Sequence, residues 1–293
     1  MSNEDIPVVI FCGGEGTRMR GGTLTKKELV EIGGRPIIWH VMRIFSAHGF
    51  NRFVLPLGYE AGQLRRYFLD YEAMTRDFTI RVGSPVLREG EKNPLPNPLP
   101  EGEGTRDLLS GGEATGKIAF RGLEQHSEWA VSLVDTGLKT DKAGRIARVA
   151  EYLTADRFFV TYGDGVGDVD IRALLAFHRA HGKLVTITAI QPKHYQYGTM
   201  DADEDGRVGG YVQYPELPYG INAGFMLFER ATLDWMRGGD AQALETGVLQ
   251  ELIAADQVMM YRHRGFWQSM DTLKDANDLE RIWQRGAPWK IWE

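Results

Sequence analysis

The sequence has one cysteine, no long hydrophobic run and no excess of basic residues, and each absence excludes a class of protein. Cys12 has no partner within the chain, which excludes an internal disulfide and favours a reducing compartment. No stretch approaches the ~20 consecutive apolar residues of a membrane-spanning helix. The start, Met1 to Asp5, lacks the basic and apolar regions of a secretion signal. We therefore expect a cytoplasmic protein without a membrane partner.

Basic residues do not outnumber acidic ones: the formal net charge is −6, and both signs are scattered along the chain. Proteins that bind nucleic acid typically carry a basic patch for the phosphate backbone, so we expect no nucleic-acid partner. A small phosphorylated ligand is not excluded, because it needs only a few cations and backbone N–H groups. With 293 residues, of which 43% are apolar, the chain can bury a large core.

Short apolar segments alternate with amphipathic segments along the sequence. The pattern predicts strand 8–12, helix 36–48 and strand 52–57, and later strand 158–161, helix 171–181 and strand 184–190. Alternation of strands and helices favours an α/β fold with a mostly parallel central sheet and helices on both faces.

The segment from about 84 to 116 differs from its surroundings. Asn93 to Pro100 is a direct four-residue repeat rich in proline, and Glu-Gly-Glu-Gly follows it. Proline removes backbone donors and glycine raises the entropic cost of ordering, so we predict a solvent-exposed insertion in one domain spanning residues 1–293. A lid or a partner-binding loop is the functional alternative.

A C-terminal aromatic segment, residues 265–293, contains Trp267, Trp283, Trp289 and Trp292. Rings of this size more often serve packing or subunit contact than ligand stacking. We therefore interpret these tryptophans as packing or subunit-contact groups.

A glycine-rich turn follows the first predicted strand. Gly13, Gly14 and Gly16 have no side chains, so their N–H groups can approach a phosphate chain closely. Arg18 and the pair Lys26-Lys27 place cations beside this turn, which suits a triphosphate. A plain tight turn with a solvated basic surface is the alternative, and the spacing does not match the G-x-G-x-x-G fingerprint of dinucleotide-binding proteins.

Two aspartates are candidates for a metal site. Asp164 follows strand 158–161 in Tyr162-Gly163-Asp164-Gly165, and open α/β sheets bind ligands at the carboxyl ends of strands. Asp271 is a second acidic group among apolar neighbours. Two carboxylates can hold Mg²⁺ while phosphate oxygens and water complete its octahedron. Alternatively, Asp164 caps a turn and Asp271 caps a helix that begins at Leu273.

Seven segments together resemble one known family. They are Phe11 to Arg18, Leu29 to Gly34, Ser132 to Gly137, Val149 to Tyr152, Thr161 to Val166, Gly265 to Leu273 and Ala287 to Glu293. The chain resembles the sugar-phosphate nucleotidyltransferases, and within them the glucose-1-phosphate cytidylyltransferases, from Val8 to about Ile80 and from Trp129 to Glu293.

The resemblance implies a Rossmann-like nucleotidyltransferase fold and a cytidylyltransferase of polysaccharide biosynthesis. Such an enzyme makes CDP-glucose and pyrophosphate from CTP and a sugar 1-phosphate, with Mg²⁺, and forms a homo-oligomer. The implied nucleotide-binding residues are Gly13, Gly14, Gly16, Thr17, Arg18, Lys27, Thr136, Gly137 and Asp164, of which Arg18 and Lys27 are catalytic. The implied metal ligands are Asp164 and Asp271. The residues implied near the sugar are Tyr162, Tyr197, Gly198, Gln213, Tyr214, Asn222 and Trp267.

Two segments depart from the family pattern. The family usually carries Glu-Lys-Pro, whose lysine holds the sugar phosphate and whose glutamate holds sugar hydroxyls, but Gln213-Tyr214-Pro215 stands here. Losing one charge-assisted hydrogen bond costs about 1.5–3 kcal/mol, or roughly tenfold to a hundredfold in binding. Glu28 replaces a proline that usually follows the catalytic lysine, so Glu28 can redirect Lys27 or pair with it, and Lys26 can then substitute.

These departures leave two alternatives open beside CDP-glucose synthesis. One is a cytidylyltransferase that acts on a different sugar phosphate or on a phosphorylated alcohol. The other is a catalytically silent nucleotide-binding regulator, although Asp164, Asp271, Arg18 and Lys27 are all retained.

Overall fold

The computed structural model describes residues 6–12, 25–71, 77–80, 118–121, 129–191, 198–213 and 219–292. Outside the described residues lie the predicted insertion, 84–116, and the site residues Gly13, Gly14, Gly16, Thr17, Arg18, Tyr197 and Tyr214. The chain divides into two compact units, Met1–Ala61 with Ser127–Glu293, and Gly62–His126. The second unit contains most of helix α2 (Ala61–Leu69) and the antiparallel pair of β5 (Asp77–Ile80) and β6 (Ile118–Arg121).

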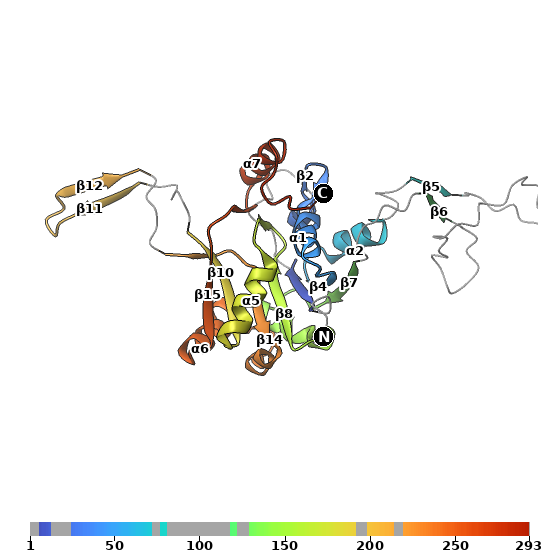
Figure 1. Ribbon diagram of the computed structural model, residues 1–293, viewed down its shortest axis with the longest axis horizontal. Helices are drawn as coiled ribbons and strands as arrows, with labels where there is room; N and C mark the ends of the chain where they lie inside the picture. The colour runs from blue at the N-terminus through green and yellow to red at the C-terminus, as the bar shows by residue number, and fades with distance from the viewer. Residues whose placement is uncertain are drawn as a thin grey trace, which may run out of the picture. The chain divides into compact units, whose positions relative to one another are not determined.

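An eight-stranded sheet forms the centre of the first unit (Figure 1). Its strands follow the order β13 (Ile221–Asn222), β10 (Val185–Ile190), β14 (Met226–Glu229), β8 (Arg157–Tyr162), β1 (Val8–Phe11), β4 (Arg52–Leu57) and β7 (Ala130–Asp135), and β15 (Val258–His263) also pairs with β10. Strands β8, β1, β4 and β7 are parallel, as are β10 and β15. The prediction of a mostly parallel sheet is confirmed, and the antiparallel strands β13 and β14 are additions to it.

Helices cover both faces of this sheet, as the sequence predicts. Successive residues of a strand point to opposite faces, and β8 shows this directly. Phe159 meets Phe45 of helix α1 (Ile37–Ala47) with ring centroids 5.4 Å apart, whereas Phe158 stacks on Phe228 at 5.6 Å. Because both faces are covered, β1 is buried at every position, and its sequence is a continuous apolar run.

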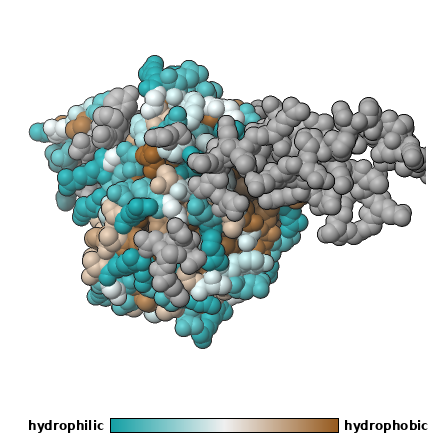
Figure 2. Space-filling model, turned by 45° about the vertical axis from the view of Figure 1, so that its right-hand side comes forward, coloured by the Kyte–Doolittle hydropathy of each residue, from teal (hydrophilic) through white to brown (hydrophobic). Residues whose placement is uncertain are grey.

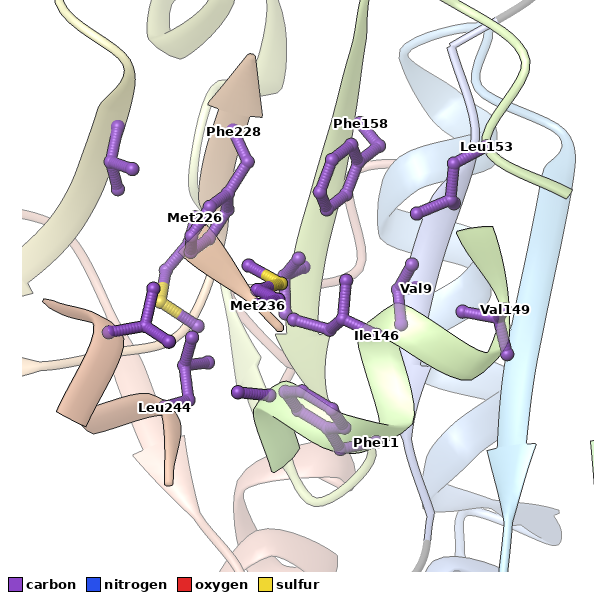
Figure 3. Packing of buried hydrophobic residues seen from close by; sticks show 14 of the residues in the cluster. Val9, Phe11, Ile146, Val149, Leu153, Phe158, Met226, Phe228, Met236 and Leu244 are labelled. Atoms are coloured by element: carbon purple, nitrogen blue, oxygen red, sulfur yellow. The ribbon is translucent and has the colours of Figure 1, made fainter. Parts of the chain in front are cut away.

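The hydrophobic cluster on the Phe158 face joins β1, β8 and β14 to two short helical segments (Figure 3). Ile146 comes from helix α4 (Lys142–Arg148), and Leu244 begins a π-helical turn, η6 (Leu244–Val248), that leads into α6 (Leu249–Ala254). The side chains of Val9, Ile146 and Leu244 are fully buried. This cluster therefore packs α4 and η6 against this face of the sheet.

The remaining elements are short, apart from two helices. Helix α5 (Ile171–His181) has the predicted bounds, begins at the N-cap Asp170 and ends at Gly182, which has a left-handed φ of 67°. Helix α7 (Leu273–Trp283) begins where the sequence predicts. The short elements are η3 (Lys27–Leu29), β2 (Glu31–Ile32), β3 (Arg35–Pro36), η4 (Ala150–Tyr152), β9 (Gly165–Gly167), β11 (Thr199–Ala202), β12 (Val208–Val212), η5 (Arg230–Trp235) and β16 (Trp267–Ser269).

The face drawn in Figure 2 is coloured mostly as hydrophilic, with hydrophobic residues in separate patches between polar ones. In the described part of the chain, no helix combines the length and apolar character needed to cross a membrane.

The C-terminal aromatic segment packs around one buried histidine of α1. His40 is fully buried, and the rings of Trp283, Trp289 and Trp292 lie 4.9, 6.1 and 6.2 Å from its ring. The indole N–H of Trp289 can only donate, and it lies 3.4 Å from Nδ1 of His40. The other ring nitrogen, Nε2, therefore carries the proton and donates to the carbonyl of Ile32 at 2.8 Å. The packing role predicted for these three tryptophans is confirmed.

This arrangement predicts an acid-sensitive stability. Burial lowers the pKa of His40 from 6.5 to about 4, against smaller opposing contributions from nearby carbonyls. Between these values the unfolded chain binds a proton that the folded chain does not, so stability falls as the pH falls from 6.5 to 4. The loss amounts to roughly 3 kcal/mol over this window. Urea unfolding at several pH values between 7 and 4.5 measures it.

The control variant is His40→Gln, which keeps a donor for the Ile32 carbonyl but does not titrate. His178, whose pKa burial also lowers to about 4, titrates in both proteins and cancels from the comparison. We expect a shallower pH dependence of stability in His40→Gln than in the unaltered protein. Equal slopes would show that His40 makes no such contribution.

Candidate active site

A short antiparallel pair of strands brings the two predicted metal ligands together. Strand β9 pairs with β16 so that Gly165 lies opposite Ser269. The ladder continues one step further, because the N–H of Met270 donates to the carbonyl of Asp164 at 2.8 Å. Asp164 and Asp271 thus emerge side by side at the carboxyl edge of the sheet, although more than 100 residues of sequence separate them.

Lys27 lies between the two aspartates. Its Nζ is 2.7 Å from Oδ2 of Asp164 and 2.7 Å from Oδ1 of Asp271. Burial alone would lower the pKa of the Lys27 ammonium, but the two carboxylates outweigh burial and raise its pKa above the ordinary value. The ammonium is therefore charged at neutral pH. The side chain of Asp271 also accepts a hydrogen bond from Ser269 Oγ at 3.0 Å.

The turn that carries Asp164 packs tightly against the end of β1. The N–H of Gly163 donates to the carbonyl of Phe11 at 3.1 Å. A Cβ at position 163 would lie 3.1 Å from that same oxygen, 3.3 Å from Sγ of Cys12 and 3.0 Å from Cγ of Glu28. Glycine therefore fits this position more closely than a larger residue would, and the turn that carries Asp164 packs against the end of β1.

Glu28 pairs with Lys26 and leaves Lys27 to the aspartates. Lys26 and Glu28 are both buried, and Nζ of Lys26 lies 3.5 Å from Oε2 of Glu28. Lys26 also donates to the carbonyl of Tyr59 at 3.0 Å. Burial raises the pKa of the Glu28 carboxyl, against the opposing charge of Lys26. The sequence leaves Glu28 to redirect Lys27 or to pair with it, but in the structure Glu28 pairs with Lys26 instead. Lys27 keeps its place between Asp164 and Asp271, and Lys26 does not replace it.

Asp271 does not cap helix α7. Thr272 is the N-cap: its hydroxyl accepts from the N–H of Asp275, and the Asp275 carboxylate accepts from the Thr272 N–H in a capping box. The Asp275 carboxylate also accepts from the N–H of Asp271 at 3.0 Å. The capping interpretation of Asp271 is therefore wrong, because the next residue takes that role and leaves the Asp271 side chain for Lys27.

Thr136 and Gly137 follow β7 at the same edge of the sheet. The Thr136 hydroxyl donates to the Leu57 carbonyl at 2.8 Å and accepts from Arg145 at 2.7 Å. Gly137 has a left-handed φ of 85°, which glycine adopts without strain. Arg145 is 4% exposed, and sequence reasoning missed it, since an isolated arginine in a helical segment carries no distinctive signal.

A polar cluster surrounds Tyr162 at the end of β8. The Tyr162 hydroxyl donates to Oε1 of Glu245 at 2.8 Å and accepts from Nδ2 of Asn222 at 3.2 Å. Nζ of Lys142 donates to the same Oε1 of Glu245 and lies 5.1 Å from the centre of the Tyr162 ring. The structure thus brings together Tyr162 and Asn222, both predicted near the sugar. Sequence reasoning missed Glu245 and Lys142, which lie in segments without a recognisable motif.

Trp267 contacts the backbone of the residue that follows Asn222 in this cluster. Its indole N–H donates to the carbonyl of Ala223 at 2.8 Å. The strand pairing of β16 with β9 sets the ring over Gly165, where an added Cβ would lie 3.5 Å from the indole nitrogen. Trp267 therefore links the segment of Asn222 to the strand that follows Asp164.

Gly198 and Gln213 lie directly before β11 and directly after β12, at the open end of their hairpin. The Tyr211 hydroxyl donates to the side-chain oxygen of Gln213, and an added Cβ at Gly198 would lie 2.2 Å from that hydroxyl. Among the described residues, Gln213 makes no hydrogen bond to Tyr162 or Asn222. The sugar-binding role of Gly198 and Gln213 stays a prediction.

The two aspartates suit Mg²⁺ better than they suit a metal ion whose ligands all come from protein side chains. In the described ranges, no group of three or more His, Cys, Asp or Glu side chains is arranged to hold a metal ion. Mg²⁺ typically takes one or two carboxylates and completes its shell with water and substrate phosphates. Asp164 and Asp271 already converge on a cationic group, the Lys27 ammonium, so their oxygens suit a divalent cation.

Two family models match the chain. The model described as nucleotidyl transferase matches residues 108–281, and the model described as MobA-like NTP transferase domain matches residues 8–82. Together they cover the segments that position Lys27, Asp164 and Asp271.

Curated relatives match over nearly their whole length. The glucose-1-phosphate cytidylyltransferase of Salmonella typhimurium is 37% identical over 292 residues, which cover 97% of this chain and 99% of the relative. A protein of Bacillus subtilis named probable glucose-1-phosphate cytidylyltransferase is 31% identical, again over 97% of this chain and 99% of its own.

A solved structure shares the fold. The structure of HddC from Yersinia pseudotuberculosis complexed with GMP-PN has a TM-score of 0.59 over 95% of this chain and 99% of its own, at 17% identity. At this identity the likeness concerns the arrangement of helices and strands alone.

Proposed function

The chain belongs to the nucleotidyl transferase family, and on that premise we propose that it makes CDP-glucose and pyrophosphate from CTP and glucose 1-phosphate. The observation that carries the proposal is the convergence of Asp164, Asp271 and Lys27 at the carboxyl edge of the sheet. The relatives from Salmonella typhimurium and Bacillus subtilis, which each match over 97% of this chain, are named for this reaction. The alternatives of another acceptor and of a silent regulator have no support in these comparisons.

In the proposed reaction, a phosphate oxygen of glucose 1-phosphate attacks the α-phosphorus of CTP. A new P–O bond forms, the bond to the β-phosphate oxygen breaks, and pyrophosphate leaves with the electron pair. The attacking oxygen is already anionic, so no general base and no covalent intermediate are needed. The protein has two tasks: to align the two phosphates, and to stabilise negative charge on the leaving group.

We assign Mg²⁺ to Asp164 and Asp271. Bound there, the ion would supply positive charge to the triphosphate. Lys27, which pairs with both aspartates in this structure, would turn its ammonium to the leaving pyrophosphate. Thr136 and Gly137 would lie beside the pyrimidine. The phosphate-binding role of Gly13, Gly14, Gly16, Thr17 and Arg18 falls outside the described residues and stays a prediction.

The test is pyrophosphate release by the purified full-length protein with Mg²⁺, glucose 1-phosphate and CTP, with UTP and dTTP in parallel. We expect release with CTP to exceed release with the other two nucleotides by at least about tenfold. A panel of other sugar phosphates and phosphorylated alcohols, each with CTP, measures acceptor preference. Faster turnover of another acceptor than of glucose 1-phosphate would overturn the proposed acceptor, and silence with every pair would overturn the enzyme.

A further inference from the structure

Four polar side chains from four separate elements meet beside Asp164. Tyr162 ends β8, Asn222 belongs to β13, Lys142 begins α4, and Glu245 lies in the π-helical turn η6. Tyr162 is two residues from Asp164 in the sequence. Burial, first of all, and the charge of Glu245 raise the pKa of the Tyr162 hydroxyl, and the charge of Asp164 adds to this rise. Turns with π-helical geometry are rare and often occur at functional sites.

Lys142 and Glu245 form an ion pair, and both side chains are accessible to a ligand. The side chains of Lys142 and Glu245 are 39% and 33% exposed, so each can reach a ligand. Burial alone would raise the pKa of Glu245, but the hydrogen bonds from Lys142 and Tyr162 outweigh it and lower that pKa. Both of these bonds go to Oε1 of Glu245. An ammonium has three donors, and among the described residues Lys142 uses one, on Glu245.

A sugar 1-phosphate presents two chemical features to a binding site: a phosphate dianion and several hydroxyls. The first requires a cation and the second requires hydrogen-bond acceptors. Gln213 and Tyr214 carry no charge. Lys27 pairs with Asp164 and Asp271 in this structure, and the proposed reaction assigns its ammonium to the leaving pyrophosphate. Lys142 and Glu245 supply one cation and one anionic acceptor on the Tyr162 side of Asp164.

We propose that Lys142 and Glu245 are the acceptor-recognising pair of this enzyme. The Lys142 ammonium binds the phosphate of the sugar 1-phosphate, and the Glu245 carboxylate accepts hydrogen bonds from the sugar hydroxyls. The Asn222 amide, held by the Gly224 N–H and the Tyr162 hydroxyl, completes the polar surface. This inference rests on the proposed function and adds to it the residues that select the acceptor.

The test compares Lys142→Met and Lys142→Arg with the unaltered enzyme. We expect Lys142→Met to raise KM for glucose 1-phosphate about ten- to a hundredfold, the usual loss for one charge-assisted hydrogen bond, while KM for CTP changes less than about twofold. Lys142→Arg keeps the charge and is expected to recover most of the affinity. Glu245→Gln should raise the same KM about tenfold.

Lys183→Met is the matched control, because Lys183 also forms a close ion pair with one carboxylate, Asp256, and lies outside the site. An unchanged acceptor KM in Lys142→Met would overturn the proposal. So would equal rises in both KM values together with a lower unfolding temperature, which a purely structural ion pair would produce.

A binding measurement separates this inference from the proposed reaction. Calorimetry with glucose 1-phosphate, in the presence of a CTP analogue that has a methylene bridge between its α- and β-phosphates, needs no turnover. If the unaltered enzyme releases no pyrophosphate, the proposed reaction fails. The calorimetric ratio between the unaltered protein and Lys142→Met then still decides the inference: a ratio of about tenfold or more supports it, and a ratio near one overturns it.

Discussion

Replacing Asp164 by asparagine is expected to lower kcat/KM for pyrophosphate release by about a thousandfold or more, which corresponds to ~4 kcal/mol of transition-state stabilisation. The amide keeps the shape of the side chain but removes the charge that holds a divalent cation. Charge on the leaving pyrophosphate is then left without its principal counter-ion. The backbone of the site should not change, because the Met270 N–H bonds to the carbonyl of residue 164 and not to its side chain.

Two comparisons make this result specific. Asp256→Asn removes a carboxylate that also pairs with a lysine but is 87% exposed, and it should keep full activity. Chelation of Mg²⁺ should reproduce the loss in the unaltered enzyme, with recovery on adding Mg²⁺ back. The free energy of unfolding of Asp164→Asn should stay close to that of the unaltered protein, since Lys27 keeps its ion pair with Asp271. A loss of activity below about tenfold would remove Asp164 from the metal site.

Prediction from the sequence is most accurate for the strands that are buried on both faces. The bounds of β4 and α5 agree with prediction, because β4 is a continuous apolar run and α5 has an Asp N-cap and a following glycine. Strands β13 and β14 could not be foreseen as antiparallel. Direction depends on which neighbour a strand pairs with, and Met226 to Glu229 would look the same in either direction.

At the site, sequence reasoning locates groups that follow a strand and misses those that reach the site from helical segments. Asp164 and Tyr162 come directly after the apolar part of β8, so their place at the edge of the sheet follows from the pattern. The approach of Asp271 depends on the register of β16 against β9, which the sequence does not encode locally. Glu245 and Lys142 lack a motif altogether, since only the packing of η6 and α4 on the hydrophobic cluster brings them to Tyr162.

Replacing Lys27 by methionine is expected to lower kcat about a hundred- to a thousandfold, the range found when one preorganised charge-stabilising donor is removed. Among the described residues, the Lys27 ammonium is the cationic group closest to both aspartates, at 2.7 Å from each. It can move to stabilise the negative charge that develops on pyrophosphate. Methionine keeps the length and apolar stem of the side chain. The activity loss should therefore appear mainly in kcat, with KM for glucose 1-phosphate changed less than about threefold.

Calorimetric measurement of Mn²⁺ binding in the absence of nucleotide distinguishes the roles of Lys27 and Asp164. In the unaltered protein, Lys27 and a divalent cation compete for the same oxygens of Asp164 and Asp271. Lys27→Met removes the competitor and leaves two carboxylates facing each other, so Mn²⁺ should bind more tightly than to the unaltered protein. Asp164→Asn removes a ligand, so Mn²⁺ should bind more weakly. Both variants lose activity but change metal affinity in opposite directions. Weaker binding in Lys27→Met would mean that the lysine organises the two aspartates and does not compete with the metal for them.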